Sequence, residues 1–246
     1  TGARCSHDPA AHDARLARID SAGVLVSAIS FDGKPTEVLS LAQRADGQVV
    51  AGGCFRNLII YEDQPVTYRH SLIAFSPTLQ IVSDFQPIVA STGKVRTILP
   101  LADGNWMALG NFSLVNGAPH IAAARINSAG VLDTTFIPPF RRPSNTLNSG
   151  VLLDDGSFLL GGDFTDNYTD QDLTGQTLVR LSPQGALLAF PRIAVSLPVL
   201  ALDAAGKILV GGGGMGNFHG IMRLLPDGQL DTTFDPGEGL SGYVEA

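Results

Sequence analysis

The chain has 246 residues, and its 16 basic and 23 acidic side chains give a formal net charge of −7. Three of the basic residues are lysines, a poor match for a phosphate backbone, so we expect no nucleic acid partner. No apolar run approaches the roughly 18 residues that a membrane helix needs, so we expect no membrane insertion. The 28 glycines and 15 prolines favour short strands joined by tight turns over helices.

In chain order, the first recurring motif is an Asp-Gly turn, a short apolar run and Gly-Gly. It occupies residues 45–55, 102–112 and 154–164, and more loosely residues 205–212. Asp-Gly between apolar runs is the strongest short signal for a β-hairpin. Glycines at the end of the second strand predict a bulge or a close approach of two backbones.

A second motif alternates with the first and consists of Arg-Ile or Arg-Leu, followed shortly by a turn glycine and an apolar residue. Copies lie at residues 18–25, 125–136, 180–187 and 223–234, with a weaker copy at residues 74–79. The turn positions 23, 79, 130, 185 and 228 are about 51 residues apart. A unit of this length cannot bury its own apolar face, so neighbouring units must stack.

Four antiparallel strands in about 50 residues are typical of a β-propeller blade. We therefore predict an all-β fold, a single propeller domain over residues 1–246 with five blades of four strands. One blade is expected to be split between the termini, with its first strand from residues 240–246, near Val244, and its outer strands from residues 1–31. Such a seam removes two exposed sheet edges.

The two motifs together resemble the delta-60 repeat, a bacterial β-propeller family of largely unknown function. The best matches are residues 102–136 and 205–234, and the Leu-Asp-Thr-Thr-Phe ending is complete at Leu132–Phe136 and Leu230–Phe234. The resemblance implies a propeller in a secreted or cell-surface bacterial protein. It supplies no catalytic residues.

Two motifs that suggest chemistry have structural explanations. Gly211, Gly213 and Gly216 match the G-x-G-x-x-G of a dinucleotide-binding loop, but no helix-forming segment follows, so we interpret them as a strand end. Asp133 and Asp231 are interpreted as acceptors for turn amides rather than catalytic carboxylates, with the phenylalanine of the same motif packed between blades.

Four arginines recur in register, each five residues before a turn glycine: Arg18, Arg125, Arg180 and Arg223. In a ring they occupy equivalent radial positions. If they point inward they form a cationic channel that binds an anion. The favoured alternative is that each braces its own blade by bonding turn carbonyls or a neighbouring aspartate.

Polar side chains gather in a loop that could bind calcium, and the candidate ligands are Asp163, Asp166, Asn167, Asp170 and Asp172. Calcium takes six to eight oxygen ligands, but the spacing is not that of an EF-hand, and a solvated loop is the favoured interpretation. No other cofactor is expected. Cys5 and Cys54 either form one disulfide or remain two buried thiols.

The stretch that departs most from the repeat is residues 56–70, where Tyr61, Glu62, Tyr68 and Arg69 suggest a contact surface for a protein or glycan. No catalytic motif is recognised, so we predict a non-enzymatic binding or structural module. We expect it to be extracellular, cell-surface or periplasmic, and part of a larger polypeptide. The alternatives are a carbohydrate-active enzyme with paired carboxylates and a sugar-binding propeller; the four glutamates offer few acids for catalysis.

Overall fold

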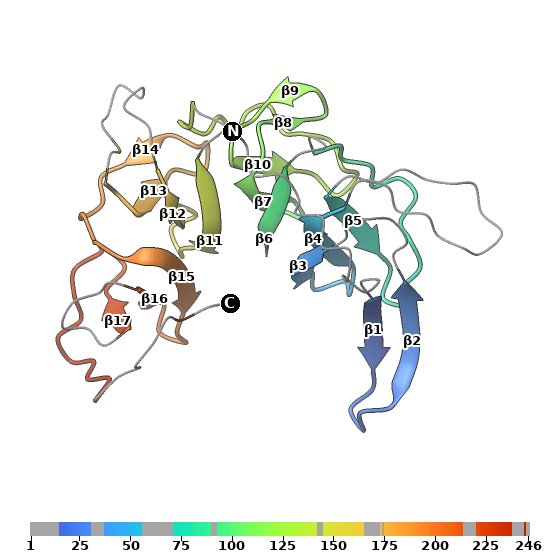
Figure 1. Ribbon diagram of the computed structural model, residues 1–246, viewed down its shortest axis with the longest axis horizontal. Helices are drawn as coiled ribbons and strands as arrows, with labels where there is room; N and C mark the ends of the chain where they lie inside the picture. Colours follow the sequence, from blue (N-terminus) through green and yellow to red (C-terminus); the bar gives the residue numbers. More distant parts are fainter. Residues whose placement is uncertain are drawn as a thin grey trace, which may run out of the picture. The chain divides into compact units, whose positions relative to one another are not determined.

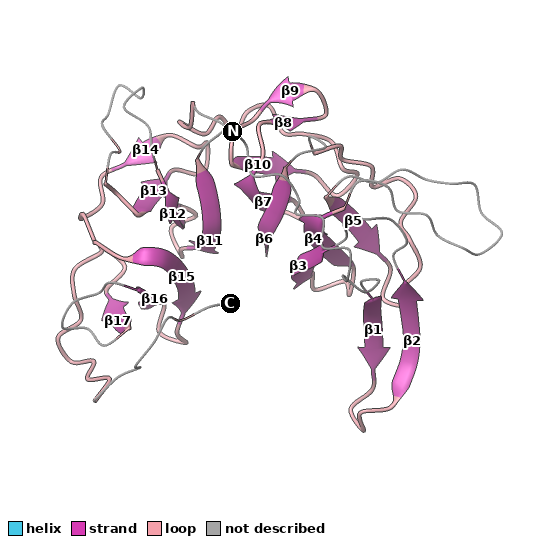
Figure 2. Ribbon diagram, viewed as in Figure 1, coloured by secondary structure: helices cyan, strands magenta, loops and turns pink. Residues whose placement is uncertain are grey.

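The computed structural model describes residues 15–30, 37–55, 71–89, 93–141, 145–164, 173, 175–213, 220–237 and 244. Every regular element in these ranges is a β-strand, as Figure 2 shows, and none of the described residues forms a helix that could cross a membrane. The predicted all-β class is therefore confirmed. The chain divides into two compact units, Thr1–Asp133 and Thr134–Ala246, which are described in turn.

Among its described residues, the first unit has ten strands in four sheets, ordered β1-β2, β3-β4-β5, β6-β7-β10 and β8-β9 (Figure 1). The strands are β1 (Arg15–Ile19), β2 (Leu25–Ser30), β3 (Glu37–Gln43), β4 (Val49–Cys54), β5 (Leu72–Phe75), β6 (Lys94–Pro100), β7 (Trp106–Asn111), β8 (Leu114–Val115), β9 (Ala118–Pro119) and β10 (Ala123–Ile126).

The second unit contains two sheets, ordered β11-β12-β13-β14 and β15-β16-β17. Its strands are β11 (Thr146–Leu152), β12 (Phe158–Asp163), β13 (Leu178–Leu181), β14 (Leu187–Leu188), β15 (Ser196–Leu202), β16 (Ile208–Gly213) and β17 (Ile221–Leu224). All pairs are antiparallel. The four larger sheets of the molecule thus repeat one meander.

In three of the four larger sheets an Asp-Gly pair forms the turn between the first and second strands, and Ala205-Gly206 takes its place between β15 and β16. In β6–β7, Gly104 has φ +81° and its amide donates to the carbonyl of Leu101 at 3.0 Å. The carboxylate of Asp103 accepts from the amide of Asn105 at 3.0 Å. Glycine is required because an L side chain strains this left-handed conformation.

The second glycine of Gly-Gly permits a close approach of two backbones. A Cβ on Gly110 would lie 2.0 Å from the carbonyl oxygen of Lys94, and Gly53 and Gly162 face Glu37 and Thr146 at 1.9 and 2.1 Å. Opposite each of them the first strand is bulged, with register shifts at Val38/Ser40, Val95/Thr97 and Leu147/Ser149. The predicted bulge and close approach are both present.

Neighbouring sheets stack through their first strands. The Ser40 hydroxyl on β3 accepts from the amide of Ile98 on β6 at 3.1 Å, and Ser149 on β11 accepts from Leu200 on β15 at 2.9 Å. The first glycine of Gly-Gly leaves room for this stacking, since a Cβ on Gly52 would lie 2.7 Å from Val95. Blades stacked in this way explain why a single repeat cannot fold alone.

The fourth strand is shorter than the repeat predicts. It is a two-residue strand, β14, in one sheet and a single bridge in three others: Phe75–Ile81, Ile126–Leu132 and Leu224–Leu230. In the sheet of β10, the pairing consists of this one bridge, whose bond runs from the amide of Asp133 to the carbonyl of Arg125 at 2.8 Å.

Val244 packs where the first strand of a further sheet would lie. A Cβ on Gly211 would be 2.8 Å from a methyl of Val244, as one on Gly52 would meet Val95 on the next first strand. The number of blades, the single domain and the split blade stay predictions.

Candidate functional site

The register arginines sit at equivalent places on the third strands and bond to their surroundings. Arg125 Nε donates to Asp133 at 2.7 Å, and Arg223 Nε donates to Asp231 at 2.8 Å. Arg180 lacks an aspartate at the matching position and donates instead to Ser157 at 2.9 Å and Asp155 at 2.6 Å. In each case the arginine bonds to side chains of its own repeat, as the bracing interpretation expects.

Two of the arginines also reach a proline carbonyl in the next sheet. Arg18 Nη1 donates to Pro77 at 3.0 Å, and Arg180 Nη1 donates to Pro226 at 3.4 Å. Both prolines lie two residues before a second-motif turn position, so the two bonds are equivalent. The guanidinium fork has enough donors to hold its own sheet and the next one together.

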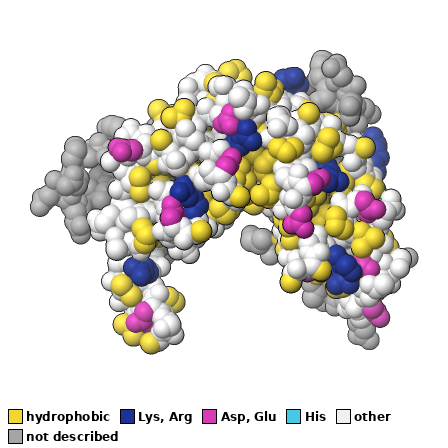
Figure 3. Space-filling model, turned by 180° about the vertical axis from the view of Figure 1, so that it is seen from behind, with side chains coloured by type: hydrophobic (Ala, Val, Ile, Leu, Met, Phe, Trp, Pro, Cys, Tyr) yellow, Lys and Arg dark blue, Asp and Glu magenta, His cyan; other side chains and the backbone are white. Residues whose placement is uncertain are grey.

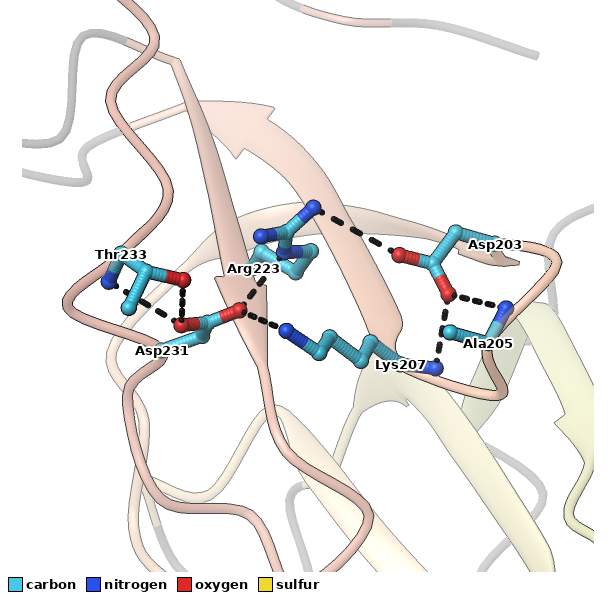
Figure 4. Close-up of polar contacts among 6 residues, drawn as sticks. All are labelled: Asp203, Ala205, Lys207, Arg223, Asp231 and Thr233. Atoms are coloured by element: carbon cyan, nitrogen blue, oxygen red, sulfur yellow. Dashed lines mark hydrogen bonds and ion pairs between the residues drawn. The ribbon is translucent and has the colours of Figure 1, made fainter.

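The densest cluster surrounds Asp231 (Figure 4), whose side chain is 4 % exposed. One carboxylate oxygen accepts from Lys207 Nζ and Arg223 Nε, both at 2.8 Å. The other accepts from the amide and the hydroxyl of Thr233, at 3.0 and 2.6 Å. The predicted role as an acceptor of turn amides is correct, but the two cationic side chains were not predicted.

A second carboxylate completes this cluster. Asp203 lies 3.5 Å from Arg223 Nη1, and its other oxygen accepts from the amides of Ala205 and Lys207 at 2.9 and 3.0 Å (Figure 4). Two cations thus face two carboxylates. The charges balance inside one sheet, so the cluster has no net charge to attract a ligand.

Two of these aspartates, Asp231 and Asp155, are held in their charged form. Hydrogen bonds from Lys207 and Thr233 lower the pKa of Asp231 far below its usual range, and Arg223 adds to the effect. The hydroxyl and amide of Ser157, with Arg180, lower the pKa of Asp155. A general acid in glycoside hydrolysis needs a raised pKa, so neither carboxylate is suited to that role.

A surface pocket of about 270 Å³ adjoins the cluster. Its lining is mainly apolar and includes Met222, Leu230 and Phe234, with Arg223 and Asp231 at one side. The Arg223 guanidinium lies 4.8 Å from the centre of the Phe234 ring. The pocket is smaller than most ligand sites, and its polar groups are already bonded to one another.

The phenylalanines of the Leu-Asp-Thr-Thr-Phe ending pack as the sequence predicts where the next sheet is described. Phe136 is fully buried and meets the ring of Phe158 on β12 edge-on at 6.0 Å. Phe234, at the same place in its repeat, is half-buried. In the copy that ends at Phe136 the phenylalanine of the motif therefore packs against the sheet of β12.

Most of the predicted loop residues lie outside the described ranges. These are Tyr61, Glu62, Tyr68 and Arg69 of the contact surface, and Asp166, Asn167, Asp170 and Asp172 of the calcium loop. Asp163, the remaining calcium candidate, ends β12 and is exposed. The contact surface and the calcium site stay predictions.

Cys54, at the buried end of β4, is bonded in a disulfide. The sequence contains one other cysteine, Cys5, which lies outside the described residues. The bridge between the two stays a prediction.

Two further contacts were missed by the sequence reasoning. Lys94 at the start of β6 forms a 3.1 Å ion pair with Glu37 at the start of β3, and Arg44 lies 5.6 Å from the centre of the Trp106 ring. Glu37 and Lys94 are each ten residues before a turn glycine, a shared register that could have identified the pair. Arg44 and Trp106 flank successive Asp-Gly turns, but nothing local predicts their contact.

The stacked antiparallel meanders and their repeated clusters define a β-propeller protein. Residues 101–136 and 206–234 match a family described as a β-propeller domain of unknown function (DUF5122). The resemblance to a propeller family of unknown function is confirmed on these two repeats. No curated protein is significantly similar to the chain in sequence.

Solved structures of similar fold come from several proteins. A protein of unknown function from Bacteroides caccae aligns over 94 % of this chain and 69 % of its own, with a TM-score of 0.56 at 15 % identity. Streptogramin B lyase aligns over 79 % and 53 %, with a TM-score of 0.53 at 13 % identity. The extracellular domain of a putative hybrid two-component system from B. thetaiotaomicron aligns over 84 % and 23 %, with a TM-score of 0.51 at 13 % identity.

These identities show a shared fold and nothing finer. The chain spans about two thirds, half and a quarter of the three proteins, respectively.

Proposed function

We propose that the chain is a non-enzymatic recognition module of a secreted or cell-surface bacterial protein, which binds a protein or glycan through the loops that interrupt its repeat. The observation that carries the proposal is that the repeated charges of the complete sheets neutralise one another. Asp231 is bonded by Lys207 and Arg223, and Arg180 is bonded by Asp155. Charges used in this way stabilise sheets, so recognition falls to residues outside the repeat.

An extracellular location is supported by two observations. Cys54 is bonded in a disulfide, and disulfides persist mainly in oxidising compartments. One structure of similar fold is the extracellular domain of a bacterial two-component system. Both fit a propeller that works outside the cytoplasm.

The proposal is tested by a glycan array, a binding screen against surface proteins and a panel of glycoside substrates. We expect binding without turnover. Hydrolysis that depends on two carboxylates would favour a carbohydrate-active enzyme and overturn the proposal. Binding at several equivalent sites would favour a sugar-binding propeller, since repeated sheets would create repeated sites.

Two sets of variants separate recognition from bracing. Tyr61→Ala and Tyr68→Ala should weaken binding at unchanged melting temperature. Arg180→Lys should lower the melting temperature and leave affinity unchanged at temperatures where the protein is folded. If Arg180→Lys weakens binding and the two tyrosine variants do not, the arginines form the binding site and the proposal is wrong.

Calcium is tested separately. If Asp163 and the acidic side chains that follow it form a site, millimolar calcium should raise the melting temperature of the metal-free protein. A calcium-dependent gain in ligand binding would make the metal part of the recognition surface. No shift at millimolar calcium would exclude the site.

A further inference from the structure

The hairpin β1–β2 has the local structure of the third and fourth strands of a blade. Its turn matches that of the β10 sheet: Asp20 Oδ1 accepts from the amides of Ala22 and Val24, as Asn127 Oδ1 accepts from Ala129 and Val131. Arg18 occupies the register position of the other third-strand arginines. Leu16 anchors the hairpin in the cluster of Phe55 and Phe75.

The hairpin differs from the complete sheets in its pairing. The third strands of the other sheets, β5, β10, β13 and β17, each pair with a second strand. Among the described residues, β1 pairs with β2 alone. A two-stranded hairpin is marginally stable in water, so a further strand beside β1 would stabilise it.

Burial at matching positions shows the same difference. Ile19 is 62 % exposed, whereas its equivalents Ile126, Leu181 and Leu224 are 0–2 % exposed. The free end of the hairpin adds Val24, Leu25 and Val26, which are 53–60 % exposed, and Figure 3 shows apolar side chains at this end. The end of β1 therefore carries an apolar side chain at a position that is buried in the complete sheets, and no described residue covers it.

The complete sheets specify the strand that would fit. The residues opposite Ile126, Leu181 and Leu224 are the first of their second strands, Trp106, Phe158 and Ile208. The next two residues of each second strand, which lie opposite the arginine and the residue before it, are also apolar. The residue after them is a glycine in two of the three sheets. A strand beside β1 should therefore have three apolar residues and then glycine.

Charge adds a further requirement. Arg125 and Arg223 bond to an aspartate eight residues later, but the residue eight after Arg18 is Val26. Arg180 also lacks an aspartate eight residues later, where the chain has Leu188. It bonds instead to Asp155, in the turn before β12, the second strand of its sheet. A strand beside β1 would satisfy Arg18 in the same way if an Asp-Gly turn preceded its apolar residues.

We propose that the edge of β1 is a docking site for an extended strand of another polypeptide, with the pattern Asp-Gly-x, three apolar residues and glycine. Backbone hydrogen bonds to β1 supply affinity, and the apolar side chains beside Ile19 with the aspartate at Arg18 supply specificity. This site is distinct from the loops proposed to bind a protein or glycan, so either proposal can fail without the other.

The probe is a fluorescent peptide with the sequence of residues 154–163, which contains β12 and its Asp-Gly turn, extended by lysines for solubility. We expect saturable binding to the full chain by fluorescence polarisation. Hydrogen exchange should slow in β1 and not in β5 or β10. N-methylation of two peptide amides that face β1 should weaken binding roughly tenfold, because about two ladder bonds are lost.

Charge specificity is tested by a double-mutant cycle. Replacing the aspartate that matches Asp155 by asparagine should weaken binding roughly two- to fivefold to the wild type and not to Arg18→Gln. Ile19→Lys should also weaken binding, whereas Val131→Lys, at a site 56 % exposed in the same unit, should not.

Three results would overturn the proposal. They are absence of peptide binding to the folded chain, protection elsewhere than β1, and protection without the peptide of those β1 amides that face away from β2. In the last case a concentration-dependent dimer would identify a second copy as the occupant, and a monomer would identify a segment of this chain.

Discussion

The close approach at the second glycine of the Gly-Gly motif can be tested with Gly110→Ala. A Cβ at this position would lie 2.0 Å from the carbonyl oxygen of Lys94 and 3.1 Å from the Cα of Val95. Carbon–oxygen contacts between strands are about 3.3 Å at their closest. The strands would have to separate by more than about 1 Å, which exceeds the tolerance of a ladder hydrogen bond.

The cost follows from this displacement. Loss of about two ladder bonds costs roughly 2 kcal/mol, and overpacking adds about 1–3 kcal/mol. We therefore expect Gly110→Ala to reduce the free energy of unfolding by about 3–5 kcal/mol. Both strands belong to the first unit, so the loss should be measured with a probe in that unit.

Trp106 provides the probe, because it is the single tryptophan, lies on β7 and is 1 % exposed. Its fluorescence in a urea titration reports the unfolding of this sheet. The matched control is Gly117→Ala, with φ +79° and no atom within 4 Å of the added Cβ. It should cost only the left-handed strain of about 1–2 kcal/mol. Equal losses in the two variants would refute the close-approach argument.

Three further predictions concern the clusters and the C-terminal contact. Arg180→Lys should cost about 1 kcal/mol in urea unfolding, since an ammonium cannot serve Ser157, Asp155 and Pro226 together. Because the folded-state pKa of Asp231 is lowered, its contribution to stability is present above the unfolded value of about 4 and is lost as the pH falls below it. The deficit of Asp231→Asn at pH 7 should therefore shrink towards pH 2, and a pH-independent deficit would contradict this linkage. Gly211→Ala should lower the melting temperature by displacing Val244, and Val244→Ala should restore part of the loss; additive effects would mean that the two residues do not touch.

The hairpins were predictable because their chemistry is local. Asp103 and Gly104 form their turn from residues that are adjacent in sequence, and the same pattern at each repeat predicts the same turn. The bulge was predictable for a related reason, since two glycines after an apolar run leave space that only a backbone can fill. The stacking of sheets followed from the length of the repeat alone.

The partners of the charged residues were less predictable because they come from different distances along the chain. Lys207 reaches Asp231 across 24 residues, and Lys94 reaches Glu37 across 57. The first contact depends on how strands pair within one sheet and the second on how two sheets stack, and a local pattern encodes neither. The short fourth strand was missed because its apolar residues resemble a strand, although the pairing there amounts to a single bridge in three of the sheets.

The register arginines show that a position can be kept while its partner changes. Asp133 and Asp231 are supplied by the Leu-Asp-Thr-Thr-Phe ending, but the repeat of Arg180 lacks that ending and obtains its carboxylate from the Asp-Gly turn of the preceding strand. A degenerate ending therefore does not indicate a weakened sheet. The same reasoning applies to Arg18, whose hairpin has neither source of carboxylate among the described residues. The repeat thus predicts the scaffold and also indicates what β1 lacks among the described residues, namely a neighbouring second strand and a carboxylate for Arg18. In the sheets of the other three register arginines both are present.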